Sequence, residues 1–165
     1  MMVTLTGFMG SGKTTVGKVL ADFLGCPFLD LDELIVQKAG KSIPDIFAQD
    51  GEAAFRQLEA KILRQQVEKY AESTVVLALG GGAVLAPASA ALLHEKTVCI
   101  YLRATLDTLL GRLVGETAGR PLADASLADR LASREPIYEE TAHVIIDTDG
   151  LSPDEVADEI IISAL

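Results

Sequence analysis

The sequence predicts an α/β fold in three layers, in which helices cover both faces of a five-stranded parallel sheet. Short apolar runs alternate with segments of helical periodicity along the whole chain, as is typical of parallel sheets. The first apolar run is followed at once by a glycine-rich loop and then by a helical pattern. A length of 165 residues is that of one domain, so we expect 1–165 to form a single unit.

The expected strands are short apolar runs, and the expected helices have apolar residues three and four positions apart. We place strands at 3–6, 28–29, 75–79, 98–102 and 144–146, and helices at 15–24, about 31–40, 42–50, 52–70, 87–94, 105–113, 127–141 and from 152 onward. Val16, Val19, Leu20 and Phe23 form the apolar face of the first helix. Pro136 falls inside a helical pattern, where a proline costs about 3 kcal/mol, so we expect a kink or break there.

Composition and charge narrow the class of protein. The chain is 49% hydrophobic and 23% charged, as in globular proteins, and its formal net charge is −10. Such an excess of acidic residues argues against nucleic acid as a main partner, because phosphate backbones attract basic surfaces. No apolar run is long enough for a membrane span and the start is not that of a signal peptide, so we expect a cytoplasmic protein. The small size and the lack of an obvious apolar interface patch predict a monomer by default.

The cysteines and histidines give no sign of a special site. Cys26 precedes a proline and Cys99 lies inside an apolar run, so we expect both to be small buried side chains and not a disulfide, a metal site or a nucleophile. His94 and His143 are far apart in the sequence, and we expect them to be too isolated for a metal or catalytic cluster.

The strongest local signal is the loop at 7–14, which matches G-x-x-x-x-G-K-[ST] at every fixed position between a strand and a helix. Glycines allow backbone N–H groups to curl around a phosphate, and the positive end of the following helix attracts the same anion. Lys13 would reach the β- and γ-phosphates, and the Thr14 hydroxyl can bind Mg²⁺. The alternative is a glycine-rich turn without a ligand. The loop predicts an ATP- or GTP-binding protein.

Ligands of open parallel sheets bind beyond the carboxyl ends of the strands, and the second strand delivers Asp30 and Asp32 there. Residues two apart in an extended segment point the same way, so we expect both carboxylates to face one cleft. Such a pair suits a hard cation or a hydroxyl group that loses a proton. Equally, one could cap the next helix while the other is a solvated surface charge.

The third strand ends in glycines 80–82, where many phosphate-loop proteins have an aspartate that holds Mg²⁺. Asp30 is therefore the best candidate for the carboxylate of a metal site. Three consecutive glycines favour neither helix nor strand. They suggest the close approach of a ligand to bare backbone amides, and the alternative is merely a flexible turn.

Several arginines could face an anionic ligand. Arg56 and Glu59 are three apart on a helix and could form an ordinary surface ion pair. Arg120 lies in a glycine- and alanine-rich segment, 116–125, that we interpret as a mobile lid. Arg134 directly precedes the stretch 135–138. Each arginine alone is more often a solvated charge than a ligand contact.

Taken together and in order, these stretches resemble the shikimate kinase family, which has a fold like that of the nucleoside monophosphate kinases. The matching stretches are Gly7-Phe8-Met9-Gly10-Ser11-Gly12-Lys13-Thr14-Thr15, Phe28-Leu29-Asp30-Leu31-Asp32, Phe55-Arg56 with Glu59, Gly80-Gly81-Gly82, Arg120-Pro121-Leu122 and Arg134-Glu135-Pro136-Ile137-Tyr138. The resemblance covers essentially the whole chain. It implies transfer of the ATP γ-phosphoryl group to the 3-hydroxyl of shikimate, giving shikimate 3-phosphate and ADP in chorismate and aromatic amino-acid biosynthesis.

The resemblance also implies a role for each matching residue. Those implied to hold the ATP phosphates are Gly10, Ser11, Gly12, Lys13, Thr14 and Thr15. Thr14 would bind Mg²⁺, and Asp30 would contact the metal through water. Asp32, in a substrate-binding helical region at about 31–62, would bind the shikimate hydroxyls and accept the reacting proton.

The arginines and glycines complete the implied site. Arg56 and Arg134 would clamp the shikimate carboxylate, helped by Gly80, Gly81 and Gly82. Arg120 would close onto the phosphates from a lid at about 114–126. Arg112 is similar to an adenine-side arginine of the family. Lys13, Asp32 and Arg120 are thus the implied catalytic residues, with ATP and shikimate as partners and Mg²⁺ as the cofactor.

Two other functions remain as alternatives. Another small-molecule kinase of this fold, such as a gluconate kinase, would share the phosphate loop without needing the set formed by Asp32, Arg56 and Arg134. A non-catalytic nucleotide-binding regulatory module could keep the loop and lose the acceptor-site arginines, which this sequence retains. The sequence departs from the family pattern at His143, where an acidic residue is frequent.

Overall fold

The five strands form one parallel sheet in the order β2-β3-β1-β4-β5, in a computed structural model that describes residues 1–116 and 125–165. The strands are β1 (Met2–Thr6), β2 (Phe28–Asp30), β3 (Val75–Ala78), β4 (Val98–Arg103) and β5 (Val144–Asp147). Every neighbouring pair is parallel. The predicted fold class is therefore confirmed, and each of the five strands differs from its expected range by one residue at one end.

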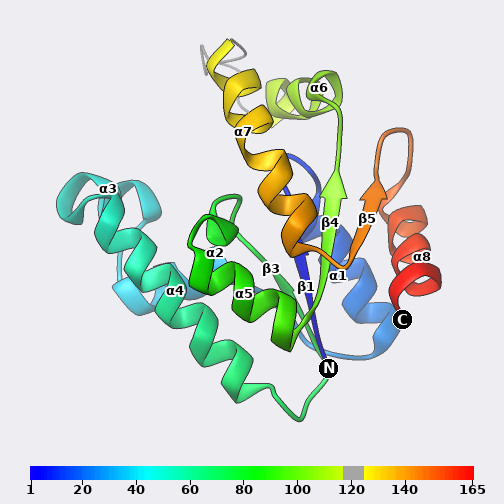
Figure 1. The fold of residues 1–165 in the computed structure, drawn as a ribbon, viewed down its shortest axis with the longest axis horizontal. Helices are drawn as coiled ribbons and strands as arrows, with labels where there is room; N and C mark the ends of the chain where they lie inside the picture. Colours follow the sequence, from blue (N-terminus) through cyan, green and yellow to red (C-terminus); the bar gives the residue numbers. More distant parts are fainter. Residues whose placement is uncertain (117–124) are drawn as a thin grey trace.

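Helices cover both faces of this sheet, which gives the three predicted layers (Figure 1). The helices are α1 (Lys13–Leu24), α2 (Leu31–Ala39), α3 (Ile43–Asp50), α4 (Glu52–Lys69), η1 (Ala83–Leu85, a 3-10 turn), α5 (Pro87–Lys96), α6 (Leu106–Glu116), α7 (Ala125–Thr141) and α8 (Pro153–Ala164). Helices α1 and α8 pack together on one face, over Val3, Leu5 and Ile100. The larger core lies on the other face, beneath α4, α5 and α7.

Local signals account for several helix ends. Gly25 ends α1 and Gly40 ends α2, each with a positive φ that glycine adopts without a steric penalty. Ser42 caps α3 by accepting a hydrogen bond from the amide of Asp45. Ser152 and Glu155 form a reciprocal capping box at the start of α8. These ends lie where the sequence predicted them.

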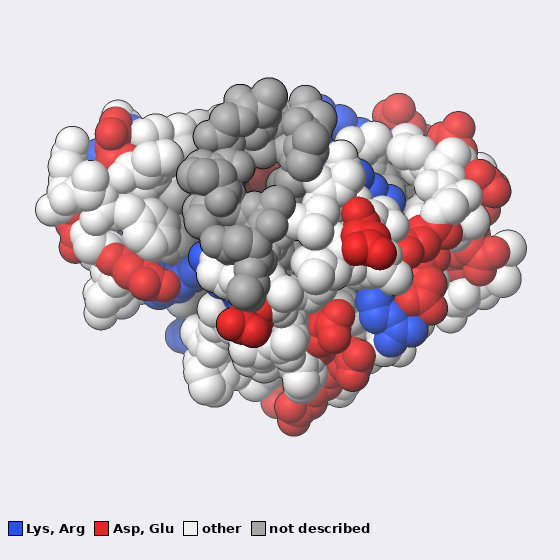
Figure 2. Space-filling view, turned by 90° about the horizontal axis from the view of Figure 1, so that it is seen from above, with Lys and Arg blue, Asp and Glu red and all other residues white. Residues whose placement is uncertain are grey.

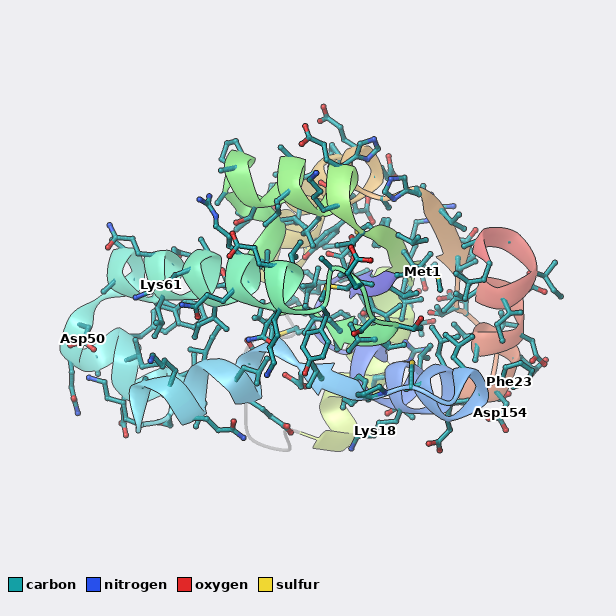
Figure 3. The ribbon with its side chains drawn as sticks, turned by 90° about the horizontal axis from the view of Figure 1, so that it is seen from below. Met1, Lys18, Phe23, Asp50, Lys61 and Asp154 are labelled. Atoms are coloured by element: carbon teal, nitrogen blue, oxygen red, sulfur yellow. The ribbon has the colours of Figure 1, made fainter. Side chains whose placement is uncertain are left out.

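The predicted apolar face of α1 is partly wrong, because Phe23 is 68% exposed (Figure 3). The buried positions are Val16, Gly17, Leu20 and Ala21, so the buried stripe is rotated away from Phe23. Gly17 belongs to this face because a Cβ there would lie 2.4 Å from the Phe28 ring. A count of apolar side chains leaves out glycine, so the predicted face was placed too close to Phe23.

Of the kink or break expected at Pro136, the break is not found, since α7 continues through the proline to Thr141, and the kink stays a prediction. One helix turn is left without a backbone hydrogen bond, because proline has no N–H to donate. Beyond the proline, Tyr138 is fully buried against Tyr101, with 5.0 Å between the ring centroids. Burial of a large aromatic side chain stabilises this part of α7 enough to offset the proline.

Cys99 is buried as expected, whereas Cys26 is only half-buried because it lies in the loop between α1 and β2; both are free thiols. The two histidines are not isolated, because the rings of His94 and His143 stack with centroids 4.4 Å apart. The expected isolation was wrong, since the carbonyl oxygen of Thr141, two residues before His143, lies 3.0 Å from Nδ1 of His94 on α5. Within the ranges that the structure describes, no group of three or more metal-binding side chains is arranged to hold an ion.

The outer surface reflects the acidic composition. Figure 2 shows acidic side chains spread over one face of the molecule, and the described basic side chains of that face form no continuous patch. Among the described residues, none of the helices is both long and apolar enough to cross a membrane. Segment 117–124, with Arg120 and most of the predicted lid, lies outside the described residues.

Candidate active site

The glycine-rich loop joins β1 to α1 and bends sharply at three glycines. Gly7, Gly10 and Gly12 have φ values of 147°, 81° and 95°, which other residues rarely adopt. No described residue accepts a hydrogen bond from the amides of Gly10, Gly12, Lys13, Thr14 or Thr15. These N–H groups therefore face the space in front of α1, where they can bind an anion such as a phosphate.

Lys13 is held across this loop. Its Nζ donates hydrogen bonds to the carbonyl oxygens of Gly7, at 2.6 Å, and Phe8, at 3.0 Å. Burial lowers the pKa of Lys13 to about 8, while the carboxylates of Asp32 and Asp30 oppose this shift by stabilising the charged form. A cationic ammonium group in this position is ready to gain a phosphate as a partner.

The two aspartates face one cleft as predicted, but not because they share an extended strand. Asp30 is the N-cap of α2 and Asp32 already belongs to its first turn. The Asp30 Oδ1 accepts hydrogen bonds from the amides of Asp32 and Glu33, so the capping alternative is also correct for Asp30. Both carboxylates line a cleft of about 270 Å³ together with Lys13.

Asp30 and Thr14 provide oxygen atoms that suit a hard cation. The Thr14 hydroxyl donates to Oδ2 of Asp30 at 3.2 Å, while Oδ1 is engaged in capping. Hydroxyl and carboxylate oxygens are the donors that Mg²⁺ prefers, usually in company with water and phosphate oxygens. The donor set therefore fits a Mg²⁺ ion that arrives with a nucleotide.

Asp32 is partly buried and lines the same cleft as Asp30. Burial raises the pKa of the Asp32 carboxyl, and the negative charge of Asp30 raises it further. The cations of Lys13 and Arg56 act in the opposite direction. A carboxylate in such surroundings is a better proton acceptor than an aspartate in water.

Each glycine of the loop at 80–82 lies beside one predicted side chain. A Cβ on Gly80 would lie 2.8 Å from Oδ1 of Asp32, and one on Gly82 would lie 2.5 Å from both Nη atoms of Arg56. A Cβ on Gly81 would lie 3.6 Å from Nη1 of Arg134. The missing side chains of Gly80 and Gly82 thus leave space for Asp32 and Arg56, and Arg134 from a third helix lies beside Gly81.

Arg56 and Glu59 do not form the exposed surface ion pair that their i,i+3 spacing allowed. Glu59 is only 4% exposed, and its Oε1 accepts a hydrogen bond from Arg56 Nη1 at 2.9 Å. Burial raises the pKa of Glu59, against the effect of Arg56. Glu59 therefore holds the guanidinium group towards Gly82. The role of Glu59 was not predicted from the sequence, because an i,i+3 spacing does not reveal burial.

A second cleft, of about 300 Å³, lies on the other side of the phosphate loop. Arg112 reaches it from α6 and donates to the Gly10 carbonyl at 3.0 Å. Thr148, Leu151 and Pro153, which were not predicted as site residues, line the same cleft. They follow β5, so a search of the carboxyl end of every strand would have found them.

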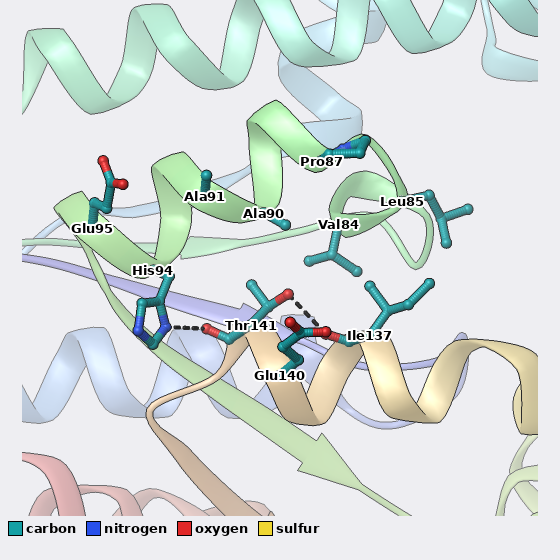
Figure 4. A pocket seen from close by; sticks show the side chains of 10 residues that line it. All are labelled: Val84, Leu85, Pro87, Ala90, Ala91, His94, Glu95, Ile137, Glu140 and Thr141. Atoms are coloured by element: carbon teal, nitrogen blue, oxygen red, sulfur yellow. Dashed lines mark hydrogen bonds between the residues drawn. The ribbon is translucent and has the colours of Figure 1, made fainter.

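A larger hollow, of about 590 Å³, lies apart from these clefts, between η1, α5 and α7 (Figure 4). Apolar side chains such as Val84, Ala90 and Ile137 line it, with His94 at one end. None of the predicted site residues belongs to its lining.

The structure therefore brings most of the predicted residues into one region. These are Gly10, Ser11, Gly12, Lys13, Thr14, Thr15, Asp30, Asp32, Arg56, Gly80, Gly81, Gly82, Arg112 and Arg134. Arg120 is the exception, since it lies outside the described residues.

Comparison with known proteins agrees with this geometry. A family model described as shikimate kinase matches residues 9–164. The shikimate kinase of Enterococcus faecalis is 43% identical over 164 residues, and the match covers 96% of this chain and 95% of that protein. The shikimate kinase of Salinibacter ruber is 46% identical over 162 residues, and the match covers 90% of this chain and 78% of that protein. The structure of shikimate kinase from Acinetobacter baumannii in complex with shikimate has a TM-score of 0.85 and 34% identity, covering 97% of this chain and 90% of that one. With its sheet, its phosphate loop and near full-length matches of this kind, the chain belongs to the shikimate kinase family.

Proposed function

We propose that this enzyme transfers the γ-phosphoryl group of ATP to the 3-hydroxyl of shikimate, giving shikimate 3-phosphate and ADP. The observation that supports it most directly is the convergence of Asp32, Arg56 and Arg134 on the glycines at 80–82, beside the phosphate loop. Shikimate is a small acid with three ring hydroxyls. It needs a cationic clamp for its carboxylate and an acceptor for its hydroxyl protons, and the cleft offers both.

The two arginines are suited to the carboxylate. A planar guanidinium group matches a carboxylate with two parallel hydrogen bonds. Arg56 is oriented by the buried Glu59, and the Arg134 guanidinium group lies 5.8 Å from the centre of the Phe8 ring. With the carboxylate between the arginines, the hydroxyls of the ring would point towards Asp32 and the phosphate loop.

Asp32 is the proposed proton acceptor. As the hydroxyl oxygen of the acceptor bonds to the γ-phosphorus, the bond from that phosphorus to the β-phosphate oxygen breaks and ADP leaves. The hydroxyl proton passes to the Asp32 carboxylate. Lys13 offsets the negative charge of the transferring group, because phosphoryl transfer depends mainly on positioning and charge stabilisation.

Mg²⁺ would be held by the Thr14 hydroxyl, with Asp30 acting through water, and when bound it would neutralise charge on the nucleotide phosphates. The nucleotide base would occupy the cleft between Arg112 and Pro153 on the far side of the loop. We also propose that the protein is a monomer that acts in the cytoplasm on ATP and shikimate. The role of Arg120 stays a prediction.

One assay separates this function from its alternatives. ADP release is measured in a coupled assay with purified protein, ATP and Mg²⁺, in the presence of shikimate, gluconate or no acceptor. We expect ADP release that depends on shikimate. NMR of the product should show the phosphoryl group on the 3-hydroxyl. Release stimulated by gluconate alone would favour the gluconate kinase alternative, and a folded protein without any stimulation would favour a regulatory module.

The carboxylate clamp has its own test. Arg134→Ala removes a charged hydrogen-bonding partner, for which a loss of about 10- to 100-fold in shikimate affinity is typical. ATP affinity should stay within about twofold. Arg64, an exposed arginine on α4, provides the control variant Arg64→Ala. An equal loss of both affinities in Arg134→Ala would contradict the assignment.

A further inference from the structure

Tyr138 joins helix α7 to the glycine loop. Its hydroxyl donates a hydrogen bond to the carbonyl oxygen of Gly81, which is 57 residues earlier in the sequence. The side chain is fully buried and its ring packs against Tyr101. Burial also raises the pKa of the Tyr138 hydroxyl, so it keeps its proton and remains a donor.

The other two carbonyls of the glycine loop are satisfied locally. The amide of Ala83 donates to Gly80 O and the amide of Leu85 donates to Gly82 O, both at 3.1 Å. The Gly81 carbonyl is thus the one that needs a side-chain donor. No described residue accepts a hydrogen bond from the amides of Gly80, Gly81 and Gly82, which leaves these three donors for a ligand.

Holding one carbonyl fixes the direction of a neighbouring amide. The peptide unit between Gly81 and Gly82 is planar and trans, so the Gly82 N–H points opposite to the Gly81 C=O. Glycines have wide conformational freedom, and a loop of three would otherwise allow this peptide plane to rotate. The Tyr138 hydroxyl therefore determines which way the Gly82 amide points.

The same helix brings Arg134 close to Gly81. Arg134 and Tyr138 are four residues apart on α7, so they lie on one side of the helix. The Arg134 guanidinium group lies beside Gly81, where a Cβ would come within 3.6 Å of Nη1. One helix face thus lies against Gly81 at two points, once with a charged group and once with a buried hydroxyl.

We propose that Tyr138 is a positioning residue of the acceptor site: its hydroxyl sets the orientation of the glycine amides and the placement of Arg134 relative to them. This inference rests on the proposed function, because it assigns those groups to the shikimate subsite. Tyr138 itself does not touch the acceptor. It affects acceptor binding through the glycine loop at 80–82 and through α7, and it does not affect the phosphate loop.

The test is Tyr138→Phe, with Tyr101→Phe as the matched control. Both variants keep the packed pair of aromatic rings and remove one hydroxyl, but only the first removes the bond to Gly81. We expect the KM for shikimate to rise about tenfold in Tyr138→Phe, as for the loss of one well-placed hydrogen bond, while the KM for ATP and kcat at saturating shikimate stay within about twofold. Tyr101→Phe should leave the KM values for both substrates within twofold of the wild type.

A measurement without substrate separates this inference from the proposed function. In ¹⁵N–¹H spectra of the free protein, the amide signals of Gly81 and Gly82 should shift or broaden in Tyr138→Phe and keep their positions in Tyr101→Phe. An unchanged shikimate KM, a parallel rise in both KM values, or unchanged glycine signals would each overturn the positioning role. If the wild type showed no shikimate-dependent ADP release while the glycine signals still moved, the proposed function would fail and the link from Tyr138 to the loop would stand.

Discussion

The Thr14 hydroxyl donates a hydrogen bond to Oδ2 of Asp30 across the end of the strand that lies between them. Thr14 follows β1 and Asp30 ends β2, and β3 separates these two strands in the sheet. β3 is followed by Leu79 and then by glycines 80–82, so no polar side chain directly follows this strand. This arrangement explains how a carboxylate from β2 can take the place of the aspartate that many phosphate-loop proteins have after the third strand.

Asp30→Asn should therefore weaken the metal site and leave the fold intact. Asparagine caps helices as well as aspartate does, so α2 and the melting temperature should change little. The loss of one carboxylate charge should raise the Mg²⁺ concentration for half-maximal activity by about tenfold, which corresponds to roughly 1.4 kcal/mol. A Mg²⁺ titration of ADP release at fixed ATP measures it, with Asp45→Asn on the exposed start of α3 as the control. An unchanged Mg²⁺ requirement would remove Asp30 from the metal site.

Lys13 should take up a proton when ATP binds at mildly alkaline pH. Its pKa of about 8 in the free protein lies below the ordinary 10.5, so part of the population is neutral at pH 8.5. Bound phosphates stabilise the charged form and raise this pKa, and protons are then absorbed from the buffer. Calorimetry of ATP binding at pH 8.5 in two buffers of different ionisation enthalpy gives the number of protons. At pH 6.5 the uptake by Lys13 should disappear, because Lys13 is already charged.

The matched variant for this proton uptake is Lys13→Arg, since arginine stays charged at every accessible pH. Its ATP binding should show no proton uptake at pH 8.5. The same pKa has a consequence for stability. Between about pH 8 and 10.5 the unfolded chain binds more protons at this site than the folded one, so the contribution of Lys13 to the free energy of unfolding should rise with pH. Equal proton uptake in wild type and Lys13→Arg would contradict the assignment.

Asp32→Asn should lower activity and raise stability together. Asparagine cannot accept the hydroxyl proton, and the loss of a general base typically lowers kcat by about 10²–10⁴-fold. The folded protein raises the pKa of Asp32 above 3.8, so at neutral pH the ionised carboxylate destabilises the fold. Removing this charge should raise the melting temperature at pH 7. The gain should fade at low pH, where Asp32 is protonated in the folded wild type.

ATP binding provides the check on Asp32→Asn, because the variant should still bind the nucleotide. Near-normal kcat in a folded variant would exclude Asp32 as the proton acceptor. A lower melting temperature at pH 7 would show that its attraction to Lys13 and Arg56 outweighs the cost of burial, and would contradict the direction of the pKa shift.

The outcome for individual residues shows what the sequence could predict. Strands, most helices and the phosphate loop follow from patterns within a few neighbouring residues, and these predictions were confirmed. The roles of Glu59 and Tyr138 depend on contacts with residues far along the chain or on burial, which no local pattern contains. The stacking of His94 on His143 was missed for the same reason.

The aspartate pair shows a second kind of limit. Asp30 and Asp32 do face one cleft, but the expected reason, an extended backbone, was wrong. The chain turns into α2 directly after Asp30, so the cap and the first helical turn bring the two carboxylates together. Helix boundaries are fixed by capping contacts that differ in strength by about 1 kcal/mol, which makes them the least predictable part of a segment.

Gly82 provides the last prediction, because substitution there should impair the site and spare the fold. The backbone of Gly82 has φ −108°, which alanine adopts easily. The new Cβ would lie 2.5 Å from both Nη atoms of Arg56, and a guanidinium group at the end of a flexible side chain can move away. Gly82→Ala should therefore displace Arg56 from the acceptor site and raise the shikimate KM about 10- to 100-fold, as expected for losing a charged hydrogen bond. The melting temperature and the KM for ATP should change little.

Gly17→Ala is the contrasting variant, since the same substitution there meets the core. Its Cβ would lie 2.4 Å from the Phe28 ring and 3.3 Å from Leu5, where rigid, packed groups cannot move away. Overpacking of this kind costs typically about 1–3 kcal/mol, so Gly17→Ala should lower the melting temperature by several degrees. Its shikimate KM should stay near the wild-type value at temperatures where it is folded. If Gly82→Ala instead lost stability and kept its shikimate KM, the glycine loop would serve the packing of η1, and the acceptor site would have to lie elsewhere.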